Sequence, residues 1–465
     1  MRISPEILII GGGPAGCAAA LQAYNEGCRN ITIVEKQPYD RHRIGEIFLT
    51  NTILEFQKLG IHDELLEFQQ KYKWNRKFAA AYVHGKDRTP WQVVNSHPFG
   101  FNELEQRGFP RNYIDEKSNV AFTLVVRRHE FDEALREICK QRGIDIIHGF
   151  VDDCNFVGDI NSNKSSIISL DIINESNEKI KARPKFIIDA TGQQAFFGKK
   201  NKNRFAFGDV GLQARYTYFE DVDFTDAIEK GFYKEGANIV SFDDGWVWIA
   251  DLGNNHTSVG IVSKYWDDDE NYFWKKLSRL PEYLLFNLDK AKVTSYKKTD
   301  VKPDNFYVHS NYRFKTETLY GKNWACAGDA AMFLDPLLSQ GVTLAVSYGS
   351  KLGKTAYHIV NDDFEPEEAL AQYEQAYINE IEILNKVVSL WYKPDFSISN
   401  DWFETSKRIS HIFGREIGED VESFRWISNL ENIQSLFDSH PEETFLKEIE
   451  EVNEVQMVSK SMKRK

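Results

Sequence analysis

A glycine-rich turn between an apolar run and an alanine-rich run limits the fold of this chain more than any other feature. Gly11, Gly13 and Gly16 form the pattern G-x-G-x-x-G directly after the apolar run 7–10, and Glu35 ends the next apolar run. In a dinucleotide-binding βαβ unit the first glycine makes the turn and the second lets a pyrophosphate approach the helix N-terminus. The third lets helix and strand pack closely, and the acid accepts from ribose hydroxyls. We therefore predict a parallel strand, a helix and a second strand with a nucleotide at the turn.

Length and composition exclude several classes of protein. The 465 residues suit two or three packed domains, and the net charge of −13 argues against a nucleic-acid partner, because phosphate binding needs a basic surface. The five cysteines include no C-x-x-C pair, and the histidines show no ligand spacing, so we expect reduced thiols and no metal. No signal peptide and no apolar run of about 20 residues is visible. We predict a soluble, cytoplasmic protein without a transmembrane segment.

Two later segments favour FAD over NAD as the nucleotide. Asp189-Ala190-Thr191-Gly192 and the segment 325–331, which contains Gly328-Asp329, resemble the two flavin motifs of the glutathione-reductase-type flavoproteins, in their aromatic-hydroxylase branch. The resemblance implies that Asp329 meets the ribityl chain and that Thr191 and Gly192 lie near the adenine half.

The predicted FAD site joins these segments to their neighbours. Within the pair Arg127-Arg128, the second arginine resembles a residue of the same branch that contacts the cofactor. The residues predicted to bind FAD are Gly11, Gly13, Pro14, Ala15, Gly16, Glu35, Lys36, Gly45, Glu46, Arg128, Thr191, Gly192, Gly328, Asp329, Pro336, Gly341 and Val342.

These motifs predict an α/β fold with three parts. A three-layer, Rossmann-like FAD-binding domain with a parallel sheet is joined by a substrate domain on an antiparallel sheet and by a helical C-terminal region. We expect the FAD-binding domain over 1–75, 126–203 and 319–360, the substrate domain over 76–125 and 204–318, and the helical region over 361–465.

Hydrophobic periodicity predicts the elements around the motifs. The segment 96–119 is rich in Pro, Gly, Phe and charged residues, and we predict a long surface loop or lid there. We expect helices over 50–72, 128–142 and 339–360, short strands over 144–188, and mostly strands over 204–315.

The segment Phe333–Gly341 narrows the class of flavoprotein. Its sequence FLDPLLSQG matches F-x-x-P-x-x-S-x-G, and the chain resembles the flavin-dependent halogenases over most of its first 360 residues. The resemblance implies that this segment lies against the flavin ring and that backbone N–H groups at Ser339, Gln340 and Gly341 bind chloride or bromide. A turn at a helix N-terminus is physically suited to an anion.

Lys77 is the predicted catalytic residue. The segment 76–85 resembles the one in which halogenases place an essential lysine, and Lys77 occupies that position. The resemblance implies that halide is oxidised to hypohalous acid, which must be held beside the substrate. An ammonium group can hydrogen-bond this oxidant or form a haloamine.

Paired tryptophans form the third point of resemblance. Gly245–Ile249 resembles the halogenase strand W-x-W-x-I-P, in which Trp246 and Trp248 would shield the substrate from the flavin and prevent monooxygenation. Ala250 and Asp251 replace the proline and its neighbour, which is a departure from the family pattern.

Two absences point to the substrate and the electron source. Tryptophan halogenases place a glutamate where this chain has Leu338, so the sequence looks more like the phenol- or pyrrole-directed subgroup. No second G-x-G-x-x-G follows residue 60, which suits an enzyme that receives reduced FAD from a separate flavin reductase.

Three other functions remain open from the sequence. A monooxygenase of the same fold would use no halide, and the replacement at Ala250-Asp251 favours it. A halogenase-like flavoprotein could instead modify aromatic or cysteine side chains of a partner protein to mature a quinone cofactor. The third of these hypotheses is a flavin-binding scaffold without turnover. For the leading hypothesis, a halogenase, we expect a small aromatic substrate, free or bound to a carrier or protein.

Overall fold

A parallel sheet carries the glycine-rich turn. The computed structural model describes residues 1–36, 43–83, 88, 90–94, 108–159, 161–206, 211–266, 271–294, 306–310 and 312–392. Within these residues β2 (Ile7–Ile10) pairs in parallel with β3 (Ile31–Glu35) and β11 (Phe186–Asp189), and every side chain of the three strands is buried. The described part of this sheet has nine strands. Their order is β1 (Arg2–Ile3), β10 (Lys179–Ala182), β9 (Ser166–Asn174), β8 (Asp145–Val157), β3, β2, β11, β21 (Trp324–Cys326) and β20 (Tyr320–Gly321).

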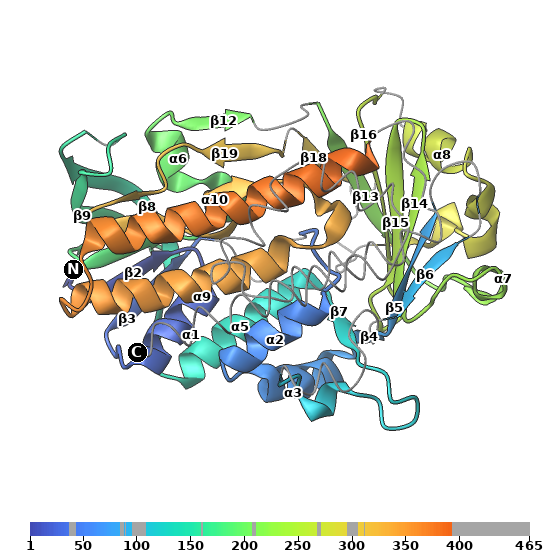
Figure 1. Ribbon diagram of the computed structural model, residues 1–465, viewed down its shortest axis with the longest axis horizontal. Coiled ribbons are helices and arrows are strands. Elements are labelled where there is room, and N and C mark those ends of the chain that lie inside the picture. Colours follow the sequence, from blue (N-terminus) through green and yellow to red (C-terminus); the bar gives the residue numbers. More distant parts are fainter. Residues whose placement is uncertain are drawn as a thin grey trace, which may run out of the picture.

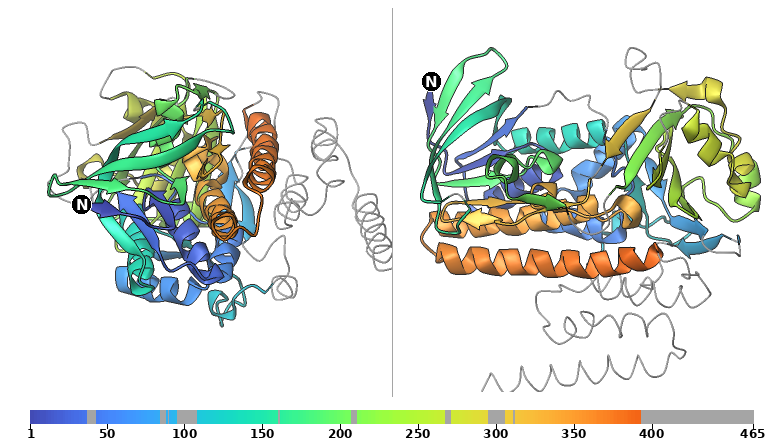
Figure 2. Two further views of the ribbon diagram at one scale, coloured as in Figure 1. Left: turned by 90° about the vertical axis from the view of Figure 1, so that its left-hand side faces the viewer. Right: turned by 90° about the horizontal axis from the view of Figure 1, so that it is seen from above.

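Long helices of the described chain lie along this sheet, as Figures 1 and 2 show. They are α1 (Pro14–Glu26), α5 (Arg128–Gln141), α9 (Gly341–Val360) and α10 (Pro366–Trp391). α1 and α9 pack with their backbones in contact, because a Cβ on Gly349 or Gly353 would lie 2.3 or 2.1 Å from a carbonyl oxygen of α1. α10 runs beside α9, and its C-terminal end reaches the second sheet (Figure 2).

The second sheet is largely antiparallel and stands at the far end of α9 and α10 (Figure 1). Val247 and Ile249 of β15 (Gly245–Asp251) pack with α7 (Thr225–Glu229) and α8 (Tyr272–Leu277). Trp246 and Trp248 belong to the larger core on the opposite face, as the period of two in a strand requires. The other described strands are β17 (Val293–Thr294), β13 (Gln213–Phe219), β16 (Thr257–Ser263), β14 (Gly236–Phe242), β5 (Ala79–Val83), β6 (Trp91–Val94) and β18 (Tyr307–Ser310).

Smaller elements connect the two sheets. β12 (Arg204–Ala206), β19 (Phe314–Thr316) and β22 (Met332–Phe333) form one ribbon, and β4 (Asn75–Lys77) pairs with β7 (Thr123–Val125). The remaining described elements are α2 (Thr50–Lys58), α3 (His62–Tyr72), α6 (Phe196–Lys200) and short 3₁₀ turns at Arg111–Tyr113, Gly192–Gln194, Pro281–Phe286, Lys290–Lys292, Gly328–Ala330 and Pro336–Leu338.

Several predicted elements need correction. The helix expected over 50–72 is two helices, because Gly60 adopts φ +69° and ends the first one. The strand at Asp145–Val157 has 13 residues rather than being short. In the predicted surface loop, Phe109 and Tyr113 are buried, so its described end packs into the core, and 96–107 lie outside the described residues. The helix predicted over 128–142 is confirmed by α5.

Candidate active site

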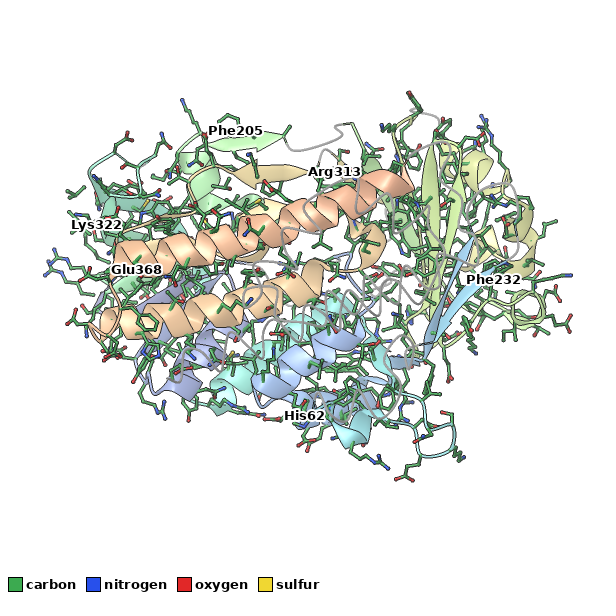
Figure 3. All side chains as sticks on the ribbon, viewed as in Figure 1. His62, Phe205, Phe232, Arg313, Lys322 and Glu368 are labelled. Atoms are coloured by element: carbon green, nitrogen blue, oxygen red, sulfur yellow. The ribbon has the colours of Figure 1, made fainter. Side chains whose placement is uncertain are left out.

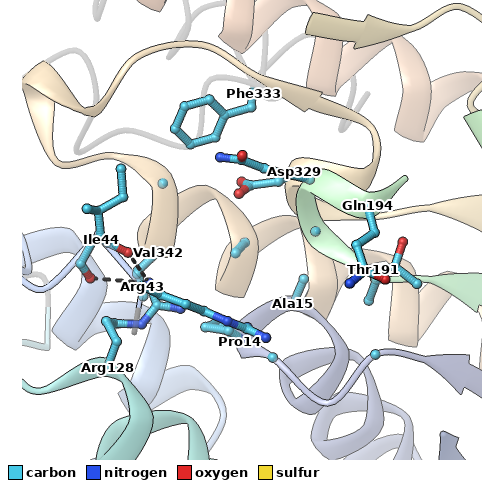
Figure 4. Close-up of a pocket in the computed structure, with 18 of the residues that line it drawn as sticks. Pro14, Ala15, Arg43, Ile44, Arg128, Thr191, Gln194, Asp329, Phe333 and Val342 are labelled. Atoms are coloured by element: carbon cyan, nitrogen blue, oxygen red, sulfur yellow. Dashed lines mark hydrogen bonds between the residues drawn. The ribbon is translucent and has the colours of Figure 1, made fainter. Parts of the chain in front are cut away.

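A cavity of about 860 Å³ lies between the two sheets. Residues at the carboxyl ends of β2, β3, β11 and β21 line it, which is where open parallel sheets bind ligands. Figure 4 shows Asp329 and Phe333 on one side of this space and Pro14, Ala15 and Arg43 on the other. Two tryptophans of the second sheet, Trp246 and Trp248, complete the lining.

The glycine-rich turn has the shape that the pattern predicts. Gly11 adopts φ +107°, and a Cβ there would lie 2.3 Å from the Ala190 carbonyl oxygen. A Cβ on Gly16 would lie 1.9 Å from the Gly11 carbonyl oxygen, so Gly16 serves packing and does not line the cavity. Gly13 does line it, at the point where α1 begins. Backbone N–H groups at this helix N-terminus favour an anion such as a pyrophosphate.

Glu35 and Lys36 line the cavity beside this turn. Glu35 is 5% exposed, and its Oε2 accepts a hydrogen bond from the Gly12 N–H at 2.5 Å. Lys36 Nζ lies 5.1 Å from the ring centre of Phe150, another lining residue. Phe150 comes from β8, and sequence reasoning missed it, because an aromatic residue within a strand has no local motif.

Two arginines that line the cavity share one carboxylate partner. Arg128 donates to the Ile44 carbonyl oxygen at 2.8 Å and pairs with Asp132, which Arg43 also contacts at 3.1 Å. Asp329 lines the cavity, and burial raises its pKa to about 6, although Arg128 and Arg43 oppose the rise. Arg127 donates instead to the backbone at Gly253 and Tyr72, so only the second arginine of the pair lines the cavity.

The two flavin motifs are held by their own turns. The buried Asp189 carboxylate accepts from the N–H groups of Thr191 and Phe197, which places Thr191 and Gly192 on the cavity. Gly328 adopts φ +60°, and a Cβ added to it would lie 2.9 Å from the Cβ of Ala15. Gly328 therefore allows close packing against α1, and it is not among the residues that line the cavity. Gly45, Glu46, Pro336, Gly341 and Val342 do line the cavity.

The Phe333–Gly341 segment folds as a capped turn at the start of α9. Asp335 Oδ1 accepts from the Leu337 N–H at 3.0 Å, and Ser339 adopts the left-handed φ +55°. The Ser339 N–H donates to the Pro336 carbonyl oxygen, so this donor is already used within the turn. Ser339 and Gly341 line the cavity, whereas Gln340, also a predicted halide residue, does not.

The tryptophans form one wall of the cavity. Their ring centres are 5.7 Å apart, Trp246 donates to the Tyr392 hydroxyl at 2.7 Å, and Trp248 donates to Ser258 Oγ at 3.0 Å. Asp251, at the position where the pattern departs, accepts from the Gly253 N–H and is not among the lining residues. The departure from the family pattern at Asp251 therefore lies outside the lining of the cavity.

Gly260 makes room for Trp248. It lies opposite Trp248 in the β15–β16 pair, and a Cβ there would be 2.1 Å from two ring carbons. We expect Gly260→Ala to push this ring toward the cavity, lower stability by about 1–3 kcal/mol and weaken FAD binding. Thermal unfolding and an FAD titration test this, and Trp248→Phe in the same background is expected to relieve the crowding. Unchanged FAD affinity in Gly260→Ala would contradict the prediction.

Lys77 is buried in the connection between the sheets. It lies at the end of β4, is 4% exposed, and its Nζ donates to the Phe48 carbonyl oxygen at 3.2 Å. Burial lowers its pKa from 10.5 to about 8. Lys77 is not among the residues that line the cavity, although Ile47, the neighbour of Phe48, is.

His309 is a second lining residue that sequence reasoning missed. Its ring stacks on Tyr216 with centres 5.9 Å apart, and it comes from β18 in the second sheet. A lone histidine in a sequence carries no spacing that could have identified it. Across the described residues no cluster of His, Cys, Asp and Glu could hold a metal ion, and no helix is long and apolar enough to cross a membrane.

Several known proteins resemble this chain in sequence. The family model described as tryptophan halogenase matches residues 6–119 and 109–439. A 1H-pyrrole-2-carbonyl-[peptidyl-carrier protein] chlorinase of Pseudomonas fluorescens is 25% identical over 408 residues, 83% of each chain. A tryptophan 2-halogenase of Chondromyces crocatus is 23% identical and covers 88% of this chain, 71% of its own.

Solved structures share the fold. The myxobacterial chondrochloren halogenase CndH superposes with a TM-score of 0.69 at 22% identity, over 93% of each chain. The flavin-dependent brominase Bmp2 gives 0.69 at 18% identity, over 94% of this chain and 99% of its own. These matches confirm the predicted α/β fold with a Rossmann-like FAD-binding domain, the resemblance to flavin-dependent halogenases, and FAD as the cofactor. The cavity fits FAD, since both flavin motifs and the glycine turn line one continuous space.

Proposed function

Because the chain belongs to the tryptophan halogenase family of flavin-dependent enzymes, we propose that it halogenates an electron-rich aromatic substrate of phenol or pyrrole type. When bound, reduced FAD would supply the means to activate O₂ and oxidise chloride or bromide to hypohalous acid. The observation that carries the proposal is that the glycine turn, the Phe333–Gly341 segment and the tryptophan wall line the same cavity. A scaffold without turnover has no use for the last two.

The proposed cofactor contacts follow the lining. Gly13 and the N-terminus of α1 would hold the pyrophosphate, Glu35 the ribose hydroxyls, and Asp329 the ribityl chain. Arg43, which sequence reasoning missed, lies within 3.5 Å of a Cβ position on Gly13 and would add positive charge near the pyrophosphate. Gly16 and Gly328 would support the site through packing rather than contact.

The proposed halide site uses the N-terminus of α9. Since the Ser339 N–H already donates to Pro336, the donors for halide would be the N–H groups that follow it, at Gln340 and Gly341. A side chain at Gly341 would meet no atom within 4 Å, so the approach to this helix end is open. Trp246 and Trp248 would keep the substrate away from the flavin.

Lys77 is proposed to hold the hypohalous acid. At pH 7, one unit below a pKa of about 8, roughly nine of ten Lys77 side chains carry a proton. The ammonium donates a hydrogen bond to the Phe48 carbonyl oxygen, which fixes the direction of the side chain.

The substrate and partners are proposed from two considerations. Leu338 stands where tryptophan halogenases carry a glutamate, and two relatives are named for a pyrrole on a peptidyl-carrier protein. A carrier-bound pyrrole is therefore the first substrate to test, with a separate flavin reductase as electron source. All five cysteines are free and buried, which supports the proposed cytoplasmic location.

A turnover assay tests the proposal. It would combine FAD, an added flavin reductase with NADH, O₂, bromide, and a panel of phenols, pyrroles and carrier-loaded pyrrole, read by mass spectrometry. Bromide incorporation is the expected result. Incorporation of oxygen without bromide would show that the protein is a monooxygenase rather than a halogenase. Reaction only with a protein substrate would favour a role in maturing a quinone cofactor.

A further inference from the structure

α10 contacts the FAD-binding domain through tyrosine hydroxyls. Tyr373 donates to the Cys326 carbonyl oxygen at 3.0 Å, and Tyr377 donates to the Gly328 carbonyl oxygen at 2.9 Å. Both acceptors belong to the second flavin motif. Two hydrogen bonds therefore join the first part of α10 to the segment that contains Asp329.

The C-terminal end of the same helix contacts both the tryptophan wall and the segment Phe333–Gly341, here called the halide segment. Tyr392, directly after α10, accepts the indole N–H of Trp246 at 2.7 Å and donates its own proton to Asp335 Oδ2 at 3.3 Å. Trp246 and Asp335 both line the cavity. The hydroxyl thus links a strand of the second sheet to the turn that precedes α9.

Asp335 is held firmly enough to act as the anchor of this link. Arg313 Nη2 and Nε lie 2.6 and 3.2 Å from Asp335 Oδ2, and the exposed fractions of the two side chains are 3% and 0%. Figure 3 shows Arg313 near the C-terminal part of α10, and its guanidinium lies 5.4 Å from the centre of the Tyr392 ring. A carboxylate paired in this way makes the hydrogen bonds to it stronger than neutral ones.

The other oxygen of Asp335 fixes the turn that precedes Ser339. Oδ1 accepts from the Leu337 N–H, and Ser339 then takes a left-handed conformation that a serine rarely adopts. A shift of Asp335 would therefore move Ser339 and the start of α9. The chain from Trp246 N–H through Tyr392 O–H to the carboxylate runs in one direction, so each bond strengthens the next.

We propose that Tyr392 is a positioning residue, whose hydroxyl sets the spacing between the tryptophan wall and the halide segment. The proposal rests on the functions proposed above for Trp246 and Phe333–Gly341. Loss of the hydroxyl would leave the Trp246 N–H and one lone pair of Asp335 without this partner. The wall and the turn would then move independently, which weakens halide binding and exposes the flavin side to water or substrate.

The experiment compares Tyr392→Phe with Tyr348→Phe. Tyr348 is a matched control, because its hydroxyl also donates to a carboxylate, that of the half-buried Glu380, at 2.6 Å, but between α9 and α10 and not at the cavity. We expect the KM for bromide to rise about five- to tenfold in Tyr392→Phe, the factor that about 1–1.4 kcal/mol represents. The share of reduced flavin lost as hydrogen peroxide is also expected to rise. Tyr348→Phe is expected to change neither.

A second measurement needs no turnover. In the flavin-free protein, the indole N–H resonance of Trp246 is identified by its absence in Trp246→Phe, and it is expected to shift in Tyr392→Phe but not in Tyr348→Phe. Adding Tyr392→Phe to Trp246→Phe is expected to change the bromide KM little further. An unmoved resonance, or equal effects of the two tyrosine substitutions on the KM, would overturn the proposal. If the wild type halogenates nothing, the proposed function fails while the resonance still tests the link.

Discussion

Replacing Lys77 with methionine is expected to remove most of the halogenation activity and to raise the stability of the protein at neutral pH. Halogenation should fall at least about a hundredfold, the usual loss when a positioned proton donor is removed. Stability should rise because the native protein holds a charge away from water: burial lowers the pKa of Lys77 from 10.5 to about 8. Methionine has a similar length and no charge. The Phe48 carbonyl oxygen would keep the hydrogen bond from Thr123 Oγ1 at 2.9 Å.

The direction of the pH dependence follows from the lowered pKa. Between about pH 8 and 10.5 the unfolded chain holds a proton on this lysine that the native protein lacks, so wild-type stability contributed by Lys77 rises with pH in that window. Below pH 8 both states are protonated, and the full cost applies, on the order of 3 kcal/mol before local relaxation. We expect Lys77→Met to gain about 1–3 kcal/mol at pH 7 and less above pH 10, measured by unfolding across this range.

Lys276→Met is the matched control for this substitution. Lys276 is also 4% exposed, and its Nζ lies 2.6 Å from Asp244 Oδ2, so methionine there removes an ion pair and should lower stability. A destabilised Lys77→Met protein would contradict the cost assigned to the buried ammonium. If Lys77→Met still incorporates bromide at the wild-type rate, Lys77 takes no part in halogenation.

The wild-type activity profile separates the two ways in which Lys77 could handle the oxidant. If the ammonium donates a hydrogen bond to hypohalous acid, halogenation should fall as the pH rises through about 8. We expect this fall, measured with flavin reduction kept faster than product formation. A rise above pH 8 would instead assign the reaction to the neutral amine, as a haloamine requires.

The sequence predicts those parts of the site that are built from contiguous residues. The turn at Gly11–Gly16, the Asp189–Gly192 turn and the Phe333–Gly341 segment each need several residue types at fixed spacing, because their backbones bend around a ligand or a neighbouring strand. Such spacing is visible in one chain without any tertiary information.

Residues that reach the cavity through tertiary packing leave no such pattern. Phe150 and His309 line the cavity from two strands far apart in sequence, and Tyr392 contacts the lining residue Trp246 from the end of α10. Each is a single aromatic residue in an ordinary strand or helix end. The break at Gly60 was missed for a related reason, since apolar periodicity continues across it and only the positive φ ends the helix. The stretch 393–465 lies outside the described residues, so the predicted helical region is described only to the end of α10 and Tyr392.

Gly16→Ala is expected to have the largest effect on the fold, with loss of bound FAD. The added Cβ would lie 1.9 Å from the Gly11 carbonyl oxygen and 3.1 Å from its carbon, well inside contact distance. Gly11 cannot yield, because its N–H donates to the Val34 carbonyl oxygen at 2.8 Å and its own Cα faces Ala190. α1 would therefore have to move off the sheet, at a cost of about 3 kcal/mol or more.

Gly341→Ala separates this packing effect from a simple change of glycine to alanine. A Cβ on Gly341 meets no atom within 4 Å, and the residue begins α9 with a backbone conformation that alanine can adopt, where Gly→Ala stabilises by about 0.4–1 kcal/mol through the unfolded chain. We expect Gly341→Ala to fold with unchanged or higher stability and to weaken bromide or FAD binding, since Gly341 lines the cavity. Thermal unfolding and the flavin content of the purified proteins measure both variants. If Gly16→Ala keeps its FAD and its melting temperature, α1 does not depend on the close contact with Gly11, and the turn holds the nucleotide by some other means.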